Sequence, residues 1–479
     1  MNASYGIDDT VAAISTPLGK GGVAVIRISG PEALAVAGRV FRPRSGRPLT
    51  DYPPRTAVWG DVVAPPHMPL CPAGGEVLDD GLCTVFRGPH SYTGEDTVEL
   101  SCHGGVLVTG NVLTACLCAG ARQALPGEFT RRAFLNGRLD LEKAEALGNL
   151  LDAGNQEQVR LSRAGMNGLL TGQAGELYGV LCGVLAGMEA GMDFPEEDLT
   201  ELTPEEILTA IRQCLARIRD TAATYRTGHA IAEGVPAVIC GRPNVGKSAF
   251  YNRLVGREAA MVTDIAGTTR DVLTETVSLG RVTLRLCDTA GLRDCDGMDT
   301  VERMGVERAR RAMAEAELIF ALFDPTRPYE AEDAALVSQL TGPDFAGKAV
   351  VWVTTKADLT GSREAAFPDG IPAGSLTVRL SSRSGAGFDR LRDAVESAFI
   401  DGNLRLGEEA VVFSARQAAA LADCAAALER AANALDSGLT YDICADDIRE
   451  ALAALGTLCG RQAREDVLTE IFSRFCVGK

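Results

Sequence analysis

A run of eight residues near the middle of the chain has the residue types and spacing that hold a nucleotide phosphate. Residues 241–248 read GRPNVGKS and match the pattern G-x-x-x-x-G-K-[ST]. In this pattern the glycines let backbone N–H groups close around phosphate oxygens, the lysine reaches the β- and γ-phosphates, and the serine binds Mg²⁺. The run follows the apolar residues Val235–Cys240 and precedes a helical pattern, which is the context that the motif requires. We therefore expect Lys247 to act in catalysis and Ser248 to bind the metal.

Two further motifs belong to the same chemistry. Residues 288–291 read DTAG directly after the apolar run Val282–Cys287. An aspartate there can hold the metal through water, and the glycine N–H can contact the γ-phosphate. Residues 263–271 lie between the two motifs and read TDIAGTTRD, where a threonine can complete the Mg²⁺ shell.

The choice of base is predicted by residues 355–358, which read TKAD and follow the apolar run Ala349–Val353. The Asp358 carboxylate can accept hydrogen bonds from N1–H and N2–H of guanine, a donor pair that adenine lacks, so it selects GTP over ATP. Residues 381–383 read SSR and can offer a backbone N–H to guanine O6. The expected nucleotide contacts are Asn244, Val245, Gly246, Lys247, Ser248, Ala249, Thr263, Asp264, Ile265, Ala266, Gly267, Thr268, Thr269, Asp288, Thr289, Ala290, Gly291, Thr355, Lys356, Ala357, Asp358, Ser381, Ser382 and Arg383.

One expected group is missing from this set. The residue after the DTAG motif is Leu292, at the place where Ras-like proteins carry a glutamine that orients the attacking water. A leucine side chain cannot orient water, so another residue must do so.

The elements around these motifs predict a mostly parallel sheet. Between residues 233 and 400, short apolar runs alternate with amphipathic stretches, which is typical of a βα domain. The runs are Val235–Cys240, Val282–Cys287, Leu318–Phe323, Ala349–Val353 and Leu376–Leu380. Residues 241–248, 288–291, 355–358 and 381–383 each follow one of these runs, so these motifs are expected at the carboxyl ends of the strands.

The rest of the chain predicts a multidomain α/β protein. Residues 1–135 contain β-like runs between turn residues and two helical patterns, which favours an N-terminal α+β domain. Residues 136–232 and 401–479 are helical in pattern. The βα domain, residues 233–400, is therefore expected to be inserted into one discontinuous helical domain. Two separate helical bundles are the alternative.

The charge and the cysteines limit the possible classes of protein. The formal net charge is −17, so non-specific binding of nucleic acid over the whole surface is not expected, and any such contact must be local or shared with a partner. The 14 cysteines form no C-x-x-C pair and the 4 histidines are widely spread, so no zinc site is expected.

The location of the protein is predicted from its first residues and its apolar runs. The N-terminal sequence has no basic stretch followed by an apolar core, so we expect no secretory signal, reduced cysteines and a cytoplasmic location. The longest apolar run, Leu177–Met188, is too short to span a bilayer and is interrupted by glycines.

Taken together, these features resemble the MnmE (TrmE) family of tRNA uridine-modification GTPases. The resemblance rests on the GTPase motifs, the helices that flank them, residues 21–30 (GGVAVIRISG) and residues 475–479 (FCVGK). It covers nearly the whole chain. It implies an inserted Ras-like P-loop GTPase domain and an N-terminal domain that binds formyl-tetrahydrofolate and forms a homodimer.

The resemblance also implies ion ligands and a catalytic acid. The matching K⁺ ligands are Asn244, Thr263, Ile265 and Thr268. The K⁺ ion would lie where an arginine finger supplies charge in other GTPases. Ser248 and Thr269 match the Mg²⁺ ligands. Glu302 matches the family's catalytic glutamate, which positions the attacking water; without the resemblance it would be interpreted as a solvated acid at a helix start.

Four charged residues match the folate contacts of the family. They are Arg27, Glu99, Arg138 and Lys479. A carboxylate can accept the N–H pair of the pterin, and an arginine or lysine can hold carboxylates or carbonyls. Without the resemblance each would be an ordinary surface charge. Cys476 has no histidine nearby in the sequence to activate it, so it is not expected to be a nucleophile.

The function implied by the resemblance is tRNA modification. With an FAD-dependent MnmG-like flavoprotein, the protein would add an aminomethyl-type group, carboxymethylaminomethyl or aminomethyl, at C5 of the wobble uridine of certain tRNAs. Folate would supply the carbon. A ribosome-assembly GTPase of the Era/EngA type is the first alternative, although the chain is acidic and shows no basic RNA-binding module. A regulatory switch whose helical arms bind another protein is the second.

One residue departs from the family pattern. The family usually has Asn-Lys-x-Asp where this chain has TKAD, and the asparagine both contacts guanine and braces the phosphate loop. Thr355 has a shorter side chain. We therefore expect a weaker brace and lower nucleotide affinity, with guanine selection through Asp358 retained.

Overall fold

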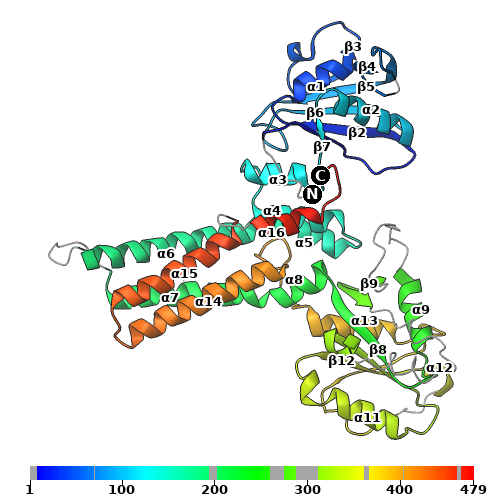
Figure 1. The fold of residues 1–479 in the computed structure, drawn as a ribbon. Coiled ribbons are helices and arrows are strands. Elements are labelled where there is room, and N and C mark those ends of the chain that lie inside the picture. Colours follow the sequence, from blue (N-terminus) through cyan, green and yellow to red (C-terminus); the bar gives the residue numbers. More distant parts are fainter. Residues whose placement is uncertain are drawn as a thin grey trace. The chain divides into compact units, whose positions relative to one another are not determined.

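The computed structural model describes residues 8–69, 71–193, 202–258, 275–286, 311–360, 366–402, 404–460 and 465–479 (Figure 1). The chain forms two compact units. The N-terminal unit comprises Met1–Gly148 and Gly456–Lys479, and the central unit comprises Asn149–Leu455. Residues from both ends of the chain thus belong to one unit.

The N-terminal unit contains a seven-stranded sheet in the order β3-β4-β5-β6-β2-β1-β7. All pairs are antiparallel except β1 with β7. The strands are β1 (Val11–Ile14), β2 (Gly21–Ser29), β3 (Phe41–Pro43), β4 (Ala57–Val63), β5 (Val77–Phe86), β6 (Thr97–Gly104) and β7 (Arg122–Gln123). The expected α+β domain is confirmed. The two- to four-residue strands β1, β3 and β7 were not predicted because such short runs show no alternation.

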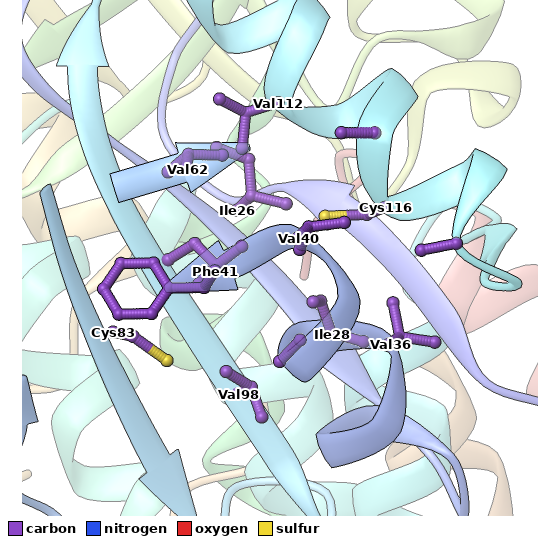
Figure 2. Close-up of a cluster of buried hydrophobic side chains, with 14 of the residues drawn as sticks. Ile26, Ile28, Val36, Val40, Phe41, Val62, Cys83, Val98, Val112 and Cys116 are labelled. Carbon is purple, nitrogen blue, oxygen red and sulfur yellow. The ribbon is translucent and has the colours of Figure 1, made fainter. Parts of the chain in front are cut away.

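One face of this sheet is covered by two helices, α1 (Ala33–Val40) and α2 (Val106–Cys118). Side chains alternate between the faces of a strand, so Ile26 and Ile28 of β2 point into the core. Figure 2 shows them near Val36 of α1 and Val112 of α2. Arg27 therefore lies on the opposite face.

The C-terminal segment completes the N-terminal unit. Helices α3 (Glu128–Leu135), α4 (Leu141–Leu151) and α16 (Glu465–Ser473) contribute to an apolar cluster or contact one another. The cluster contains Leu141, Ala144, Leu468, Phe472 and Phe475. Beyond α16, Val477 forms a β-bridge with Pro126.

The helices of the central unit come from two separate parts of the sequence. They are α5 (Gln156–Met166), α6 (Leu169–Asp193), α7 (Pro204–Ala223), α8 (Tyr225–Ala232), α14 (Ala415–Asp436) and α15 (Tyr441–Leu458). Helix α7 packs along α14 (Figure 1). Arg212 of α7 pairs with Asp436 of α14 at 2.6 Å. The expected discontinuous helical domain is confirmed, while its exact boundaries after residues 135, 232 and 400 stay predictions.

Both of these long helices begin at side-chain caps that the sequence encodes. Thr203 and Glu206 form a capping box at α7, and Ser414 and Gln417 form one at α14. Each box satisfies backbone N–H groups that have no partner within the helix.

One helical stretch, Gln156–Ala190, is long and apolar enough to cross a membrane by length and composition, with a mean hydropathy of 1.3. The apolar run Leu177–Met188 is one part of this longer stretch. Its α6 part contacts α5 and α7 and buries a stripe at helical spacing. The stripe consists of Leu170, Ala174, Leu177, Leu181, Val184 and Met188. Helices in the core of a bundle meet the same length and hydropathy criterion, so this stretch alone does not indicate a membrane span.

The sheet of the central unit has the order β13-β12-β11-β8-β10-β9. Its strands are β8 (Val235–Cys240), β9 (Glu275–Leu279), β10 (Val282–Leu286), β11 (Leu318–Phe323), β12 (Ala349–Thr354) and β13 (Leu376–Arg379). Every pair is parallel except β9 with β10. The expected mostly parallel sheet is confirmed, and β9 is an additional strand at its edge.

Helices lie on both faces of this sheet. Helices α9 (Lys247–Glu258) and α13 (Phe388–Phe399) share one apolar cluster with the sheet. Helix α11 (Ala331–Leu340) shares a second cluster with the opposite face. Every residue of β11 is buried between them. A central strand covered on both faces reads as a continuous apolar run, which is why it was predicted at its correct bounds.

Candidate functional site

The phosphate loop lies between the end of β8 and the start of α9. Its backbone takes left-handed values at Gly241 (φ 144°), Asn244 (φ 63°) and Gly246 (φ 103°). A Cβ at Gly241 would lie 2.5 Å from the carbonyl oxygen of Leu322 in β11, so only glycine fits there. The sequence pattern and the local backbone therefore require the same residues.

The Lys247 side chain folds back over this loop. Its Nζ donates hydrogen bonds to the carbonyl oxygens of Gly241 and Arg242, both at 2.8 Å. Burial lowers the pKa of the Lys247 ammonium. Ser248 and Ala249 follow on the exposed first turn of α9. This arrangement holds a cation at the start of a helix, where an anionic phosphate is favoured.

Thr355 braces the phosphate loop although its side chain is shorter than the asparagine usual in the family; the expected effect on nucleotide affinity stays a prediction. The Thr355 hydroxyl donates to the carbonyl oxygen of Val245 at 2.6 Å. Its backbone N–H donates to the carbonyl oxygen of Phe323 at 2.9 Å. Thr355 is 2% exposed and Val245 is 3% exposed, so water does not compete for the bond. The shorter side chain suffices because β12 ends close beneath the loop.

A second brace runs through Lys356, which has a left-handed φ of 56°. Its Nζ donates to the carbonyl oxygen of Asn244 at 3.2 Å and pairs with Asp324 Oδ2 at 2.5 Å. Burial acts to raise the pKa of Asp324, but hydrogen bonds from Lys356 and Thr326 outweigh it and hold that pKa below its usual value. Asp324 was not among the predicted site residues. It directly follows an apolar run, which is the signal that identified the other acids at this edge.

The expected guanine-selecting residues meet at the ends of β12 and β13. The buried Ser381 hydroxyl donates to Asp358 Oδ1 at 2.6 Å, and this bond lowers the pKa of the exposed Asp358 carboxyl. The backbone N–H of Ala357 donates to the carbonyl oxygen of Leu380 at 3.1 Å. Asp358 is thus ionised at neutral pH and oriented as an acceptor. Ser382 and Arg383 follow Ser381 in the turn after β13.

Part of the expected nucleotide site lies outside the described residues. This part comprises Thr263, Asp264, Ile265, Ala266, Gly267, Thr268, Thr269, Asp288, Thr289, Ala290, Gly291, Leu292 and Glu302. Their assignments stay predictions.

A second group of expected residues meets in the N-terminal unit. Arg27 and Glu99 are partners in the β2–β6 register, and Arg27 Nη2 lies 2.8 Å from Glu99 Oε1. The Arg27 guanidinium lies 5.1 Å from the ring centre of Tyr92 and 5.6 Å from that of Phe129. These two aromatic residues were not predicted, because nothing in the sequence places them near Arg27.

The C-terminal residues extend this second group. The backbone N–H of Phe129 donates to the carbonyl oxygen of Lys479 at 3.2 Å, and the Ser15 hydroxyl donates to that of Gly478 at 3.0 Å. A Cβ at Gly478 would lie 2.1 Å from the carbonyl oxygen of Ile14, so the tail packs too closely for any side chain there. Lys479 is thereby held near the end of β1 and the first turn of α3.

The charges of this group act on one another. Burial lowers the pKa of Lys479, and the charge of nearby Arg27 lowers it further, while Glu99 opposes the shift. The fourth expected residue, Arg138, packs against Gly94, where a Cβ would lie 3.2 Å from Arg138 Cγ. Interactions thus link Arg27, Glu99 and Lys479 within the described structure.

Comparison with known proteins covers nearly the whole chain. The model of the MnmE helical domain matches residues 141–476, and that of the GTP-binding protein TrmE N-terminus matches residues 10–138. The tRNA modification GTPase MnmE of Symbiobacterium thermophilum is 45% identical over 98% of this chain and 100% of that protein. The protein of the same name from Moorella thermoacetica is 40% identical over 99% and 100%. A solved structure of Era from Aquifex aeolicus is 24% identical, covers 40% of this chain and 65% of its own, and has a TM-score of 0.27.

Proposed function

The chain belongs to the MnmE family of tRNA modification GTPases, and from this premise we propose that it is activated by K⁺ and modifies the wobble uridine of certain tRNAs. Hydrolysis of GTP in tRNA modification, with Mg²⁺ at the nucleotide, follows from family membership. The proposal adds the group that is attached to the tRNA, its carbon source and the partner protein. The protein works with an FAD-dependent MnmG-like partner to place a carboxymethylaminomethyl or aminomethyl group at C5, and 5-formyltetrahydrofolate or a related folate supplies the carbon.

The observation that carries the GTPase part is the meeting of two groups at one edge of the central sheet. Lys247 lies over a phosphate loop of the required backbone shape, and Asp358 presents an ionised carboxylate after β12. The first group suits phosphate and the second suits the N1–H and N2–H donors of guanine. Thr355 and Lys356 tie the two together, since each bonds to a carbonyl of the phosphate loop.

The K⁺ part is supported by Asn244. Its main-chain carbonyl is held by Lys356, while its exposed side-chain amide makes no hydrogen bond with any described residue. An amide oxygen in this place suits a monovalent cation beside the phosphates. The cation supplies positive charge where charge accumulates in the transition state. Lys247 neutralises the phosphates from the loop side, and Glu302 is proposed to position the attacking water.

The folate part is supported by the group around Arg27. Glu99 is a carboxylate able to accept the N–H pair of a pterin, and its neighbours Arg27 and Lys479 are cations able to hold a carboxylate or a carbonyl. A folate would supply both the N–H pair for Glu99 and the carboxylates or carbonyls for the two cations. Arg138 is proposed to contact the folate from its place beside Gly94.

The remaining proposals concern assembly and location. We propose that the protein is a homodimer through its N-terminal domain, forms a heterotetramer with the flavoprotein, contacts tRNA, and is cytoplasmic. Because the net charge is −17, the flavoprotein is expected to supply much of the basic surface that tRNA requires.

The decisive experiment is mass spectrometry of wobble uridines in cells that lack this chain. Loss of the C5 group, restored by the parent gene, is the expected result. Complementation with Lys247→Ala is expected to fail, and complementation with the exposed-surface variant Arg474→Ala is expected to succeed. Unchanged wobble uridines with a defect in ribosome assembly would overturn the proposal in favour of an Era-type function.

A further inference from the structure

The β9–β10 hairpin, residues 275–286, connects the two chain segments that carry the expected metal and γ-phosphate motifs. Residues 263–271 precede β9 and residues 288–291 follow β10. Within the described sheet, β9 is an edge strand that pairs only with β10. The hairpin is therefore the backbone link between the two motifs, so a nucleotide-dependent change at either motif would reach this hairpin along the chain.

One side-chain amide of the helical domain contacts both strands of this hairpin. Asn155 lies just before α5, and its Oδ1 accepts a hydrogen bond from the backbone N–H of Gln158 at 2.9 Å, which caps the helix. Its Nδ2 donates to Ser278 Oγ at 3.0 Å on β9 and to Thr283 Oγ1 at 3.1 Å on β10. Ser278 and Thr283 are direct partners in the β9–β10 register, so the amide bridges both strands.

Three further contacts surround this amide. At the hairpin turn, Arg281 Nε lies 3.4 Å from Glu157 Oε2 of α5. The backbone N–H of Arg281 donates to Glu396 of α13 at 2.9 Å. The side-chain amide of Gln158 donates to the carbonyl oxygen of Ala232 in α8 at 3.2 Å. The first turn of α5 is thus fixed to the hairpin and to the helix that leads into the GTPase domain.

We propose that Asn155 is a positioning residue that couples the nucleotide state to the helical domain. The Oδ1 atom of Asn155 caps α5, and its Nδ2 atom contacts the hairpin. A displacement of the hairpin would therefore displace the first turn of α5. The hydroxyls of Ser278 and Thr283 are the receiving groups. Thr283 is 2% exposed, which protects the contact from water. The inference rests on GTP binding at the phosphate loop and goes beyond it by naming how the state of that site reaches α5.

The test separates the hairpin contact from the helix cap. Serine caps helices about as well as asparagine, so Asn155→Ser keeps α5 but is too short to reach the hairpin. Thr283→Val keeps the approximate volume of the side chain and removes the acceptor for Asn155, together with the long bond that the Thr283 hydroxyl donates to the carbonyl oxygen of Ile231 at 3.4 Å. The matched control is Asn167→Ser, an exposed position at the other end of α5.

Hydrogen exchange of the α5 amides is measured in the full chain with GDP and with a non-hydrolysable GTP analogue, alongside nucleotide affinity and single-turnover hydrolysis. In the parent and in Asn167→Ser, α5 exchange is expected to differ between the two nucleotides by about threefold or more. In Asn155→Ser and in Thr283→Val this difference is expected to vanish, and the double variant is expected to match either single one. Affinity and single-turnover rate should stay within about twofold of the parent, a change that corresponds to less than one neutral hydrogen bond.

Several results would overturn the inference. The inference is wrong if the parent binds GTP but its α5 amides exchange equally fast with GDP and with the GTP analogue. It is also wrong if the difference in α5 exchange between the two nucleotides persists in Asn155→Ser. Additive effects in the double variant would show two independent perturbations rather than one contact. Failure of the parent to bind or hydrolyse GTP would instead refute the proposed function, and the inference with it.

Discussion

The Thr355 hydroxyl is expected to set nucleotide affinity through its bond to the phosphate loop. Thr355→Val keeps the shape of the side chain and removes the donor to Val245. The Val245 carbonyl would then lack this partner in a place that water does not reach, because both residues are almost fully buried. Leaving a buried acceptor unsatisfied costs about 1–3 kcal/mol. If the whole cost opposes the loop shape that binds phosphate, GDP and GTP affinity falls roughly 5- to 150-fold.

The assay is calorimetric titration of each variant with GDP and with a GTP analogue. Thr341→Val is the matched control, because it also removes a hydroxyl-to-carbonyl bond, at the end of α11 and away from the phosphate loop. Its nucleotide affinity should equal that of the parent. Thr355→Asn can offer the same carbonyl an amide donor, so its affinity should stay within about threefold of the parent, equivalent to roughly half of one hydrogen bond.

Two results would refute this reasoning. If Thr355→Val binds nucleotide as tightly as the parent, the bond to Val245 does not hold the loop in its binding shape. If Thr355→Asn binds more than tenfold tighter, asparagine makes a contact with guanine that threonine cannot replace, and the brace is not the main contribution of this position.

Three further predictions concern the same site. Replacing K⁺ by Na⁺ at equal ionic strength should slow GTP turnover strongly in the parent and make no difference in Asn244→Ala; equal parent rates in both salts would contradict the proposed cation. Glu302→Ala should bind GTP normally, but its single-turnover rate of hydrolysis should fall roughly a hundredfold or more, because Leu292 cannot orient water. A rate equal to that of the parent would show that Glu302 is a solvated acid without a role in hydrolysis. Asp324→Asn removes the charged partner of Lys356, and a hydrogen bond to a charged group contributes about 1.5–3 kcal/mol. The folded-state pKa of Asp324 is lowered, so its contribution to stability is present above its unfolded pKa and is lost as pH falls. The parent should therefore lose more stability than Asp324→Asn between neutral and acidic pH in chemical denaturation, and parallel losses would contradict the pairing.

Local patterns in the sequence were sufficient for the phosphate loop and for most of the central sheet. The loop requires glycine at two left-handed positions and a lysine at the start of a helix, and these requirements act within eight residues. Strand β11 was predicted at its exact bounds because burial on both faces leaves only apolar residues. Strand β9 was missed because it is a short edge strand without a continuous apolar run.

Residue identity alone did not show that a brace exists at the position where this chain departs from its family. Thr355 has a shorter side chain than the usual asparagine, yet its hydroxyl reaches the phosphate loop. The brace depends on the distance between the end of β12 and the phosphate loop, which are separated by about a hundred residues of sequence and brought together by the parallel sheet. No local pattern encodes that distance.

The sequence by itself therefore determined the class of chemistry, the order of the elements and the family. Only the tertiary structure decided which side chains meet. It placed Lys479 beside Arg27 and Glu99, from opposite ends of the chain, and it placed Asn155 against the β9–β10 hairpin. Motifs and periodicity are set by backbone geometry over a few residues, whereas these meetings depend on how whole elements pack, and packing is a property of the complete fold.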